Sequence, residues 1–265
     1  MFTFVKYYNN CSAPDAVKIL ESYAGVEGVN ITPKQKLEAT NVCKKFICKS
    51  NQKSYSLKTL PDNSMDKYER RLDKMAVWER EGISIESMDR FQVRYDRFSD
   101  RLVYPIRNIN GDIMNIGGRA LDPNWKEKGL RKYTYFSGWN GGMNVIYGLS
   151  ENIEEIRRKK EIIIFEGCKS VLMADGWGIK NTGALLTSHL SPAQLKILLS
   201  LEARVVFALD KDVKIKDDHN INKLKRYTNV FFLCDTDGCL DSKDSPTDKG
   251  LDVFVNLYKK KYRLI

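Results

Sequence analysis

The chain has 265 residues, of which 42% are hydrophobic and 29% are charged, and its formal net charge is +10. This composition is typical of a soluble globular protein and excludes wholesale disorder. The sequence has no apolar run of about 18 residues and no apolar secretory core near its start, so we expect a cytoplasmic protein without a membrane segment.

Positive charge is concentrated in two stretches. Residues 34–58 contain seven lysines and one acidic residue, and residues 90–119 contain six arginines. The planar guanidinium group suits phosphate oxygens, so we expect the arginine-rich stretch to contact phosphate, whereas the lysine-rich stretch is equally well explained as a solvated basic face. The six cysteines form no CxxC pair and no Cys/His quartet, which favours reduced thiols over zinc ligands or disulfides.

The first half of the chain predicts two helices and a small sheet. Ser12 is a good cap for a helix over 12–25, and a linker or exposed hairpin follows at 50–64. A second helix is predicted from Met65 to Glu81. Residues 91–121 change to short alternating runs, which indicate an antiparallel or mixed sheet with a type I′ hairpin turn at Asn110–Gly111.

The second half alternates strands and helices. Apolar runs predict buried strands at 161–165, 205–209 and 230–233, with a weaker strand near 182–186. Helices are predicted over 170–175 and 191–201. This alternation predicts an α/β fold with a parallel sheet that has helices on both faces.

Acidic residues follow three of these strands. Glu166 follows the first strand, and Asp210 and Asp212 follow the second. The third strand leads into a segment, 234–250, whose acids are Asp235, Asp237, Asp241, Asp244 and Asp248. Parallel strands bring their carboxyl ends to one edge of the sheet, and several carboxylates that meet there need a compensating charge. Oxygen ligands of this kind suit Mg²⁺ or Mn²⁺, although an aspartate after a strand is often only a helix cap.

At this point the residues resemble a known family. The segment FEGCKSVLMADGWGIKNTGALLTSHLSPAQ with VVFALDKDV resembles the Toprim domain of DnaG-type primases, topoisomerases and some nucleases. RLVYPIRNINGDIMNIGGRAL, RKYTYF and NVIYGL are similar to the basic amino-terminal subdomain of a DnaG-type primase core, and KDSPTDKG is similar to the family's acidic segment. The segment at 2–26 resembles the helical tail that follows the zinc ribbon in such primases.

The resemblance implies a function for the acidic residues. Glu166 would be the general base or a metal-orienting acid, and Asp210 and Asp212 would be metal ligands. Asp244, with Asp248 as the less certain member, would hold a further metal ion or the metal-bound phosphates of the nucleotide. Asp235-Thr236-Asp237 is a second DxD that we interpret as a decoy.

The resemblance also implies partners for the basic residues. Arg107, Arg119 and Lys132 would contact template phosphates or the incoming triphosphate, with solvent exposure as the alternative. The partners would be a single-stranded DNA template, ribonucleoside triphosphates and the RNA–DNA hybrid. A replicative helicase would bind through regions that this chain lacks. The family's zinc ribbon is absent, and Ser170 stands where many members carry aspartate.

The resulting domain hypothesis has three parts. Residues 1–64 form a helical segment and linker, 65–158 a small basic mixed α+β subdomain, and 159–265 a Toprim domain with a Rossmann-like parallel sheet flanked by helices. The predicted function is that of a phage or bacterial DNA primase, which synthesises short RNA primers on single-stranded DNA by metal-dependent nucleotidyl transfer. The alternatives are a Toprim-type metal-dependent nuclease and a non-catalytic Toprim DNA-binding module.

Overall fold

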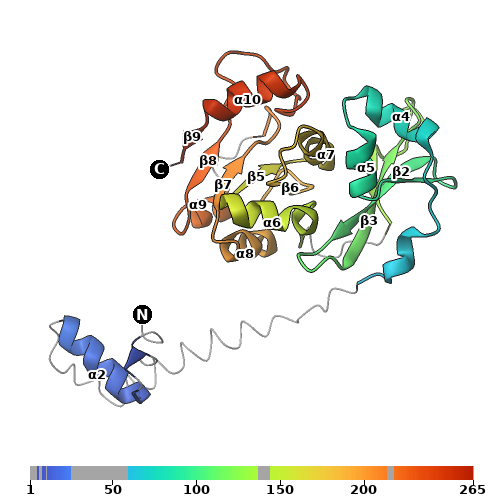
Figure 1. Cartoon of the computed structure of the whole chain (residues 1–265). Coiled ribbons are helices and arrows are strands. Elements are labelled where there is room, and N and C mark those ends of the chain that lie inside the picture. The colour runs from blue at the N-terminus through green and yellow to red at the C-terminus, as the bar shows by residue number, and fades with distance from the viewer. Residues whose placement is uncertain are drawn as a thin grey trace. The chain divides into compact units, whose positions relative to one another are not determined.

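The computed structural model describes residues 5, 8, 9, 11–24, 59–136, 144–213 and 218–264 (Figure 1). The chain forms two compact units, residues 1–56 and 57–265. Helix α2 (Ala13–Ala24) lies in the first unit and confirms the helix predicted over 12–25. The lysine-rich stretch and most of the predicted linker lie outside the described residues. Among the described residues, no helix has the length and apolar character that a membrane span requires.

The second unit begins with three short helices, and here one sequence prediction is half wrong. A 3-10 helix (Asp62–Met65) is followed by α4 (Leu72–Arg80) and α5 (Ile85–Arg90), so the predicted helix from Met65 to Glu81 exists only in its second half. The reason lies at Glu69, whose backbone pairs with Tyr95 through N–O distances of 3.0 and 2.7 Å. This pairing holds the segment extended at the edge of a sheet.

That sheet is antiparallel, one of the two forms that the alternation predicted, and it has four strands. Its order is β1 (Arg94–Asp96), β2 (Arg101–Arg107), β3 (Ile113–Ala120) and β4 (Tyr133–Tyr135). The β2–β3 hairpin is confirmed, but its type I′ turn is wrong. The loop has five residues because Asn108 accepts hydrogen bonds from the backbone of Asn110 at 2.9 Å and of Asp112 at 3.0 Å.

The second sheet is the parallel one that the apolar runs predicted. Its order is β6 (Thr182–Ala184), β5 (Glu161–Phe165), β7 (Arg204–Phe207), β8 (Val230–Phe232) and β9 (Tyr262–Arg263). The first four strands run parallel, and β9 adds an antiparallel edge. The sequence analysis did not predict β9. All four cysteines among the described residues are free thiols, as expected.

Helices cover both faces of the parallel sheet (Figure 1). One face packs against α6 (Leu149–Lys159), α8 (Pro192–Ser200) and α9 (His219–Leu224), and the other packs against α7 (Cys168–Gly176) and α10 (Leu251–Lys259). The helices predicted over 170–175 and 191–201 are therefore confirmed as α7 and α8. Alternating strand residues feed the two cores: Ile162 and Ile164 face the first, whereas Ile163 and Phe165 face the second.

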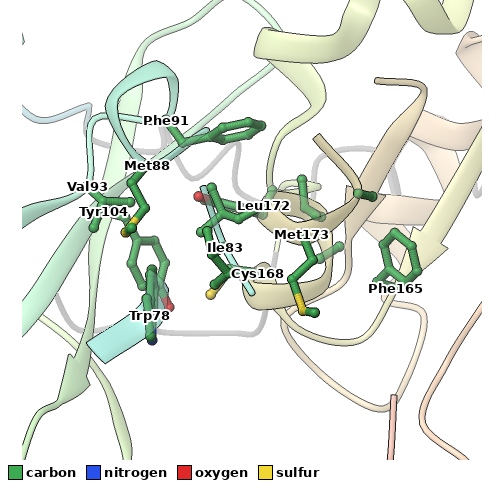
Figure 2. Packing of buried hydrophobic residues seen from close by; sticks show 14 of the residues in the cluster. Trp78, Ile83, Met88, Phe91, Val93, Tyr104, Phe165, Cys168, Leu172 and Met173 are labelled. Carbon is green, nitrogen blue, oxygen red and sulfur yellow. The ribbon is translucent and has the colours of Figure 1, made fainter. Parts of the chain in front are cut away.

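Helix α7 joins the two sheets. Its Cys168, Leu172 and Met173 pack with Trp78 and Tyr104 of the antiparallel half in one buried cluster (Figure 2). An ion pair with a buried carboxylate also joins the two halves.

In that pair, Arg90 of α5 binds Asp175 of α7, whose carboxylate also accepts a hydrogen bond of 2.7 Å from Ser87. The antiparallel sheet is thus fixed against the helix that begins beside Glu166.

Candidate metal and active site

The carboxyl ends of β5 and β7 bring the predicted acids to one edge of the parallel sheet. Glu166 directly follows β5 and its carbonyl oxygen accepts a hydrogen bond of 2.8 Å from Leu186. Asp210 lies three residues beyond β7, after Ala208 has made a last bond of 2.8 Å to the β5 residue Ile164. The two strands are direct neighbours in the sheet, so their ends approach each other.

Asp248, which lies in the segment before α10, is close to Glu166 and Asp210. Its carboxylate accepts a backbone hydrogen bond of 2.9 Å from Ser245 and lies 3.3 Å from the ammonium of Lys169. Lys169 also contacts Glu81 at 3.1 Å. Lysine therefore compensates part of the negative charge on Asp248.

The surroundings of Asp210 oppose its ionisation. Burial, with the charges of Glu166, Asp248 and Asp212, raises the pKa of Asp210 to about 7, and Ser245 opposes the shift. Burial and the charge of Asp212 also raise the pKa of Glu166, whereas His189 lowers it. These four carboxylates thus influence one another electrostatically, as several acids in one site must.

A cavity of about 310 Å³ lies beside these acids. Glu166, Asp210 and Asp248 line one side of it. The remaining lining includes lysines and tyrosines, namely Lys132, Lys169, Lys243, Tyr104, Tyr133 and Tyr135. Burial, followed by the charge of Arg119, lowers the pKa of Lys132. The site therefore combines acidic groups with a basic and aromatic wall.

Among the basic residues predicted from sequence, the structure separates Arg107 from the other two. Arg119 lies over the Tyr133 ring, with 5.5 Å between its guanidinium carbon and the ring centroid, and it neighbours Lys132. Arg107 binds Glu151 at 3.6 Å and the Gly111 carbonyl at 2.6 Å. Arg119 pairs with Leu102, so Arg107 stands five residues, or about 17 Å, along β2 from that position.

Asp244 is also held elsewhere. Its carboxylate accepts a backbone hydrogen bond of 2.9 Å from Asp241 and binds Lys249 at 3.1 Å, and it does not line the cavity. Of the two acids, Asp248 is the one that lines the cavity together with Asp210. The sequence places both acids in one short loop and contains no signal that separates them.

The second DxD has partners of its own. Asp235 binds Lys211 at 2.9 Å and accepts two backbone hydrogen bonds, from Cys239 at 2.8 Å and Leu240 at 2.9 Å. Asp237 binds Lys260 at the end of α10. Both acids have partners that organise the loop, which agrees with the decoy interpretation.

Three residues of the cavity wall, Tyr133, Tyr135 and Lys169, were not predicted from the sequence. Tyr133 and Tyr135 are two residues apart in β4, and the strand period of two puts both side chains on one face. That signal was available in KYTYF. Lys169 follows Glu166 by three residues at the start of α7, and its contact with Asp248 depends on tertiary structure that the sequence pattern does not show.

The donor set fits a hard divalent cation. All the acidic groups are carboxylates, Asp210 is half-buried, and the three neighbouring acids raise its pKa. Within the described residues, no three Asp, Glu, His or Cys side chains form a ready-made cage for an ion.

One part of the chain matches a known domain family. Residues 33–135 match the model of the DNA primase catalytic core, N-terminal domain. The SPbeta prophage-derived uncharacterized protein YorJ of Bacillus subtilis strain 168 is 31% identical over 216 residues, which are 71% of this chain. The chain covers 57% of that protein's length.

Solved structures show the same fold. The zinc-binding and RNA polymerase domains of the Aquifex aeolicus primase match with a TM-score of 0.61 at 18% identity, over 99% of this chain and 70% of that one. A DnaG primase catalytic domain bound to single-stranded DNA matches with a TM-score of 0.57 at 17% identity, over 76% of this chain and 77% of that one. The chain therefore has the fold of the DnaG catalytic core, and residues 33–135 are similar to the N-terminal domain of the DNA primase catalytic core.

Proposed function

We propose that this protein synthesises short RNA primers on single-stranded DNA by metal-dependent nucleotidyl transfer. The observation that carries the proposal is the cavity that Glu166, Asp210 and Asp248 line together with Lys132 and two tyrosines, Tyr133 and Tyr135. Acids that share a site with basic and aromatic groups are what a phosphoryl-transfer enzyme needs to hold cations, phosphates and bases.

Asp210, Asp212 and Asp248 would hold Mg²⁺ or Mn²⁺. A divalent cation bound there would neutralise the charge that develops on the reacting phosphate oxygens. The pKa of Glu166 is raised by burial and by Asp212, which improves its ability to accept a proton from the primer 3′-hydroxyl. Arg119 and Lys132 would bind phosphates of the template or of the incoming ribonucleotide.

Tyr133 and Tyr135 would contact bases or sugars. Both are partly exposed, lie on one strand and line the same cavity as the acids. Aromatic rings beside basic groups bind single-stranded nucleic acid through stacking and backbone charge, and such binding weakens with salt. The single-stranded DNA in the related DnaG structure is consistent with this partner.

The domain division is also a proposal. The antiparallel sheet belongs to the predicted subdomain at 65–158 and the parallel sheet to the Toprim domain at 159–265. Leu149 and Ile156 of α6 pack in the core of the parallel sheet. This packing favours a boundary before α6 over one at 158/159.

The products of one reaction distinguish the functions. The full chain is incubated with single-stranded DNA, labelled ribonucleotides and Mg²⁺ or Mn²⁺, and the products are separated by size. Labelled oligoribonucleotides support the proposal, and shortened DNA indicates a nuclease. Glu166→Gln should reduce synthesis at least about 100-fold. Glu154→Gln, which removes the same charge at a side chain that is 88% exposed, should retain it.

A further inference from the structure

Three buried hydroxyl groups form a hydrogen-bonded cluster next to the acids. Ser170 Oγ lies 2.7 Å from Ser245 Oγ, and Thr247 Oγ1 donates to Ser170 Oγ at 2.9 Å and lies 3.4 Å from Ser245 Oγ. The exposed fractions of Ser170, Ser245 and Thr247 are 4%, 7% and 0%. The cluster joins the first turn of α7 to the loop before α10.

The cluster lies against two of the acids. Thr247 donates to Ser170, which leaves Ser170 able to donate to Ser245. The backbone N–H of Ser245 donates to Oδ2 of Asp248 at 2.9 Å, and its side chain lies close enough to Asp210 to oppose the rise in the pKa of that carboxyl group. Ser245 therefore binds one carboxylate and lies beside the other, and the other two hydroxyls fix its orientation.

Stability alone does not account for three hydroxyls at this place. A buried hydroxyl costs free energy unless it is bonded, and an apolar cluster of the same shape would be about as stable. An oriented donor, in contrast, restricts the carboxylate that accepts from it. Such outer partners set the direction of metal ligands and strengthen cation binding.

We infer that Thr247, Ser170 and Ser245 are positioning residues that hold Asp210 and Asp248 in the orientation required to bind a divalent cation. This inference rests on the proposed function. It assigns the hydroxyls no contact with the substrate, so their effect should appear in cation affinity before any nucleotide is present.

The test is Mn²⁺ binding to the full chain, measured by electron paramagnetic resonance of the free ion. Thr247→Val keeps the shape of the side chain and removes its hydroxyl, and it should weaken Mn²⁺ binding about 10-fold. Thr247→Ser keeps the hydroxyl and should bind Mn²⁺ like the wild type. Ser245→Ala, which removes the hydroxyl beside Asp210, should lose at least as much affinity as Thr247→Val.

Thr228→Val is the matched control. Thr228 is partly buried and donates to the Ala203 carbonyl at 2.9 Å, so its loss should leave Mn²⁺ affinity unchanged. Equal affinity of wild type, Thr247→Val and Ser245→Ala would overturn the inference and leave the metal site intact. A larger loss in Thr247→Ser than in Thr247→Val would assign the residue a packing role and would also overturn it. Failure of the wild type to bind Mn²⁺ would refute the proposed function together with the inference.

Discussion

The ammonium of Lys169 lies 3.3 Å from the carboxylate of Asp248, and both residues line the cavity that contains Glu166 and Asp210. Lys169 is also bound to Glu81, and its side chain is 28% exposed. Burial lowers the pKa of Lys169, but the two acids outweigh it and raise the pKa overall, so the lysine remains charged at neutral pH. A fixed positive charge at this distance competes with any cation that Asp248 would bind.

Lys169→Met should therefore bind Mn²⁺ more tightly than the wild type. The change removes the competing charge and keeps the length and much of the apolar surface of the side chain, so we expect a gain of about 3- to 10-fold in affinity. Mn²⁺ titration measures it. Lys249→Met is the control, because Lys249 binds Asp241 at 2.7 Å and Asp244 at 3.1 Å outside the cavity. Weaker binding by Lys169→Met would contradict the competition.

Asp210→Asn should stabilise the protein in a pH-dependent way when no cation is added. Burial and neighbouring acids raise the pKa of Asp210 to about 7, while the unfolded chain ionises this group near its ordinary value of 3.8. Between these values the unfolded state binds fewer protons than the folded state, so the wild type loses stability as the pH rises. The melting temperature of Asp210→Asn should exceed that of the wild type by an amount that grows from about pH 4 to pH 7 and then levels off.

Thermal unfolding in a chelator across pH 4–8 measures this difference. Added Mn²⁺ should reduce it, because the cation binds the wild-type carboxylate in the folded state. A difference between the two proteins that stays constant with pH would contradict the assigned environment of Asp210.

Arg90→Leu should destabilise the fold more than removal of a surface arginine. Asp175 is only 5% exposed and loses its charged partner, so we expect a decrease of about 3 kcal/mol in the free energy of unfolding. Arg70→Leu breaks an exposed pair with Asp89 and should cost less than about 1 kcal/mol. Urea unfolding compares the two variants, and equal losses would contradict the structural importance of the Arg90–Asp175 pair.

Gly117→Ala should disturb the wall of the cavity. A Cβ atom at this position would lie 2.4 Å from the ring of Tyr104. Tyr104 is fully buried, lines the cavity and has little room to move. Overpacking of this kind costs about 1–3 kcal/mol. Gly176→Ala, where the nearest atom would lie at 3.5 Å, should be neutral or stabilising. The midpoints of urea unfolding of the two variants and the wild type test this prediction. An unchanged midpoint for Gly117→Ala would contradict the close contact with Tyr104.

The sequence predicted the sheets well because their patterns are local. Alternation along β2 and β3 and apolar runs in β5 and β7 reflect burial on one or two faces of each strand. It failed at residues 66–71, where the bridge between Glu69 and Tyr95 overrides helical propensity. The hairpin turn was misjudged because Asn108, which lies before the Asn–Gly pair, orders the loop through its side chain.

The residues of the candidate site also fall into two groups, those that the sequence pattern predicts and those that depend on tertiary contacts. Glu166 directly follows β5 and Asp210 lies three residues beyond β7, so the pairing of these neighbouring strands was enough to bring them together. The choice between Asp244 and Asp248 depends on how a loop folds back, and the contacts of Lys169 and Ser245 depend on the packing of α7 against that loop. Such long-range contacts leave no spacing pattern in a single sequence.

The most direct test of the account is ribonucleotide incorporation by Asp210→Asn on a single-stranded DNA template, beside the wild type and Glu154→Gln. We predict that Asp210→Asn loses synthesis at least about 100-fold, whereas DNA affinity changes less than about 3-fold, because the cation site is lost and the basic wall remains. Synthesis by Asp210→Asn at the wild-type rate would contradict the assignment of the acidic cluster as the catalytic centre.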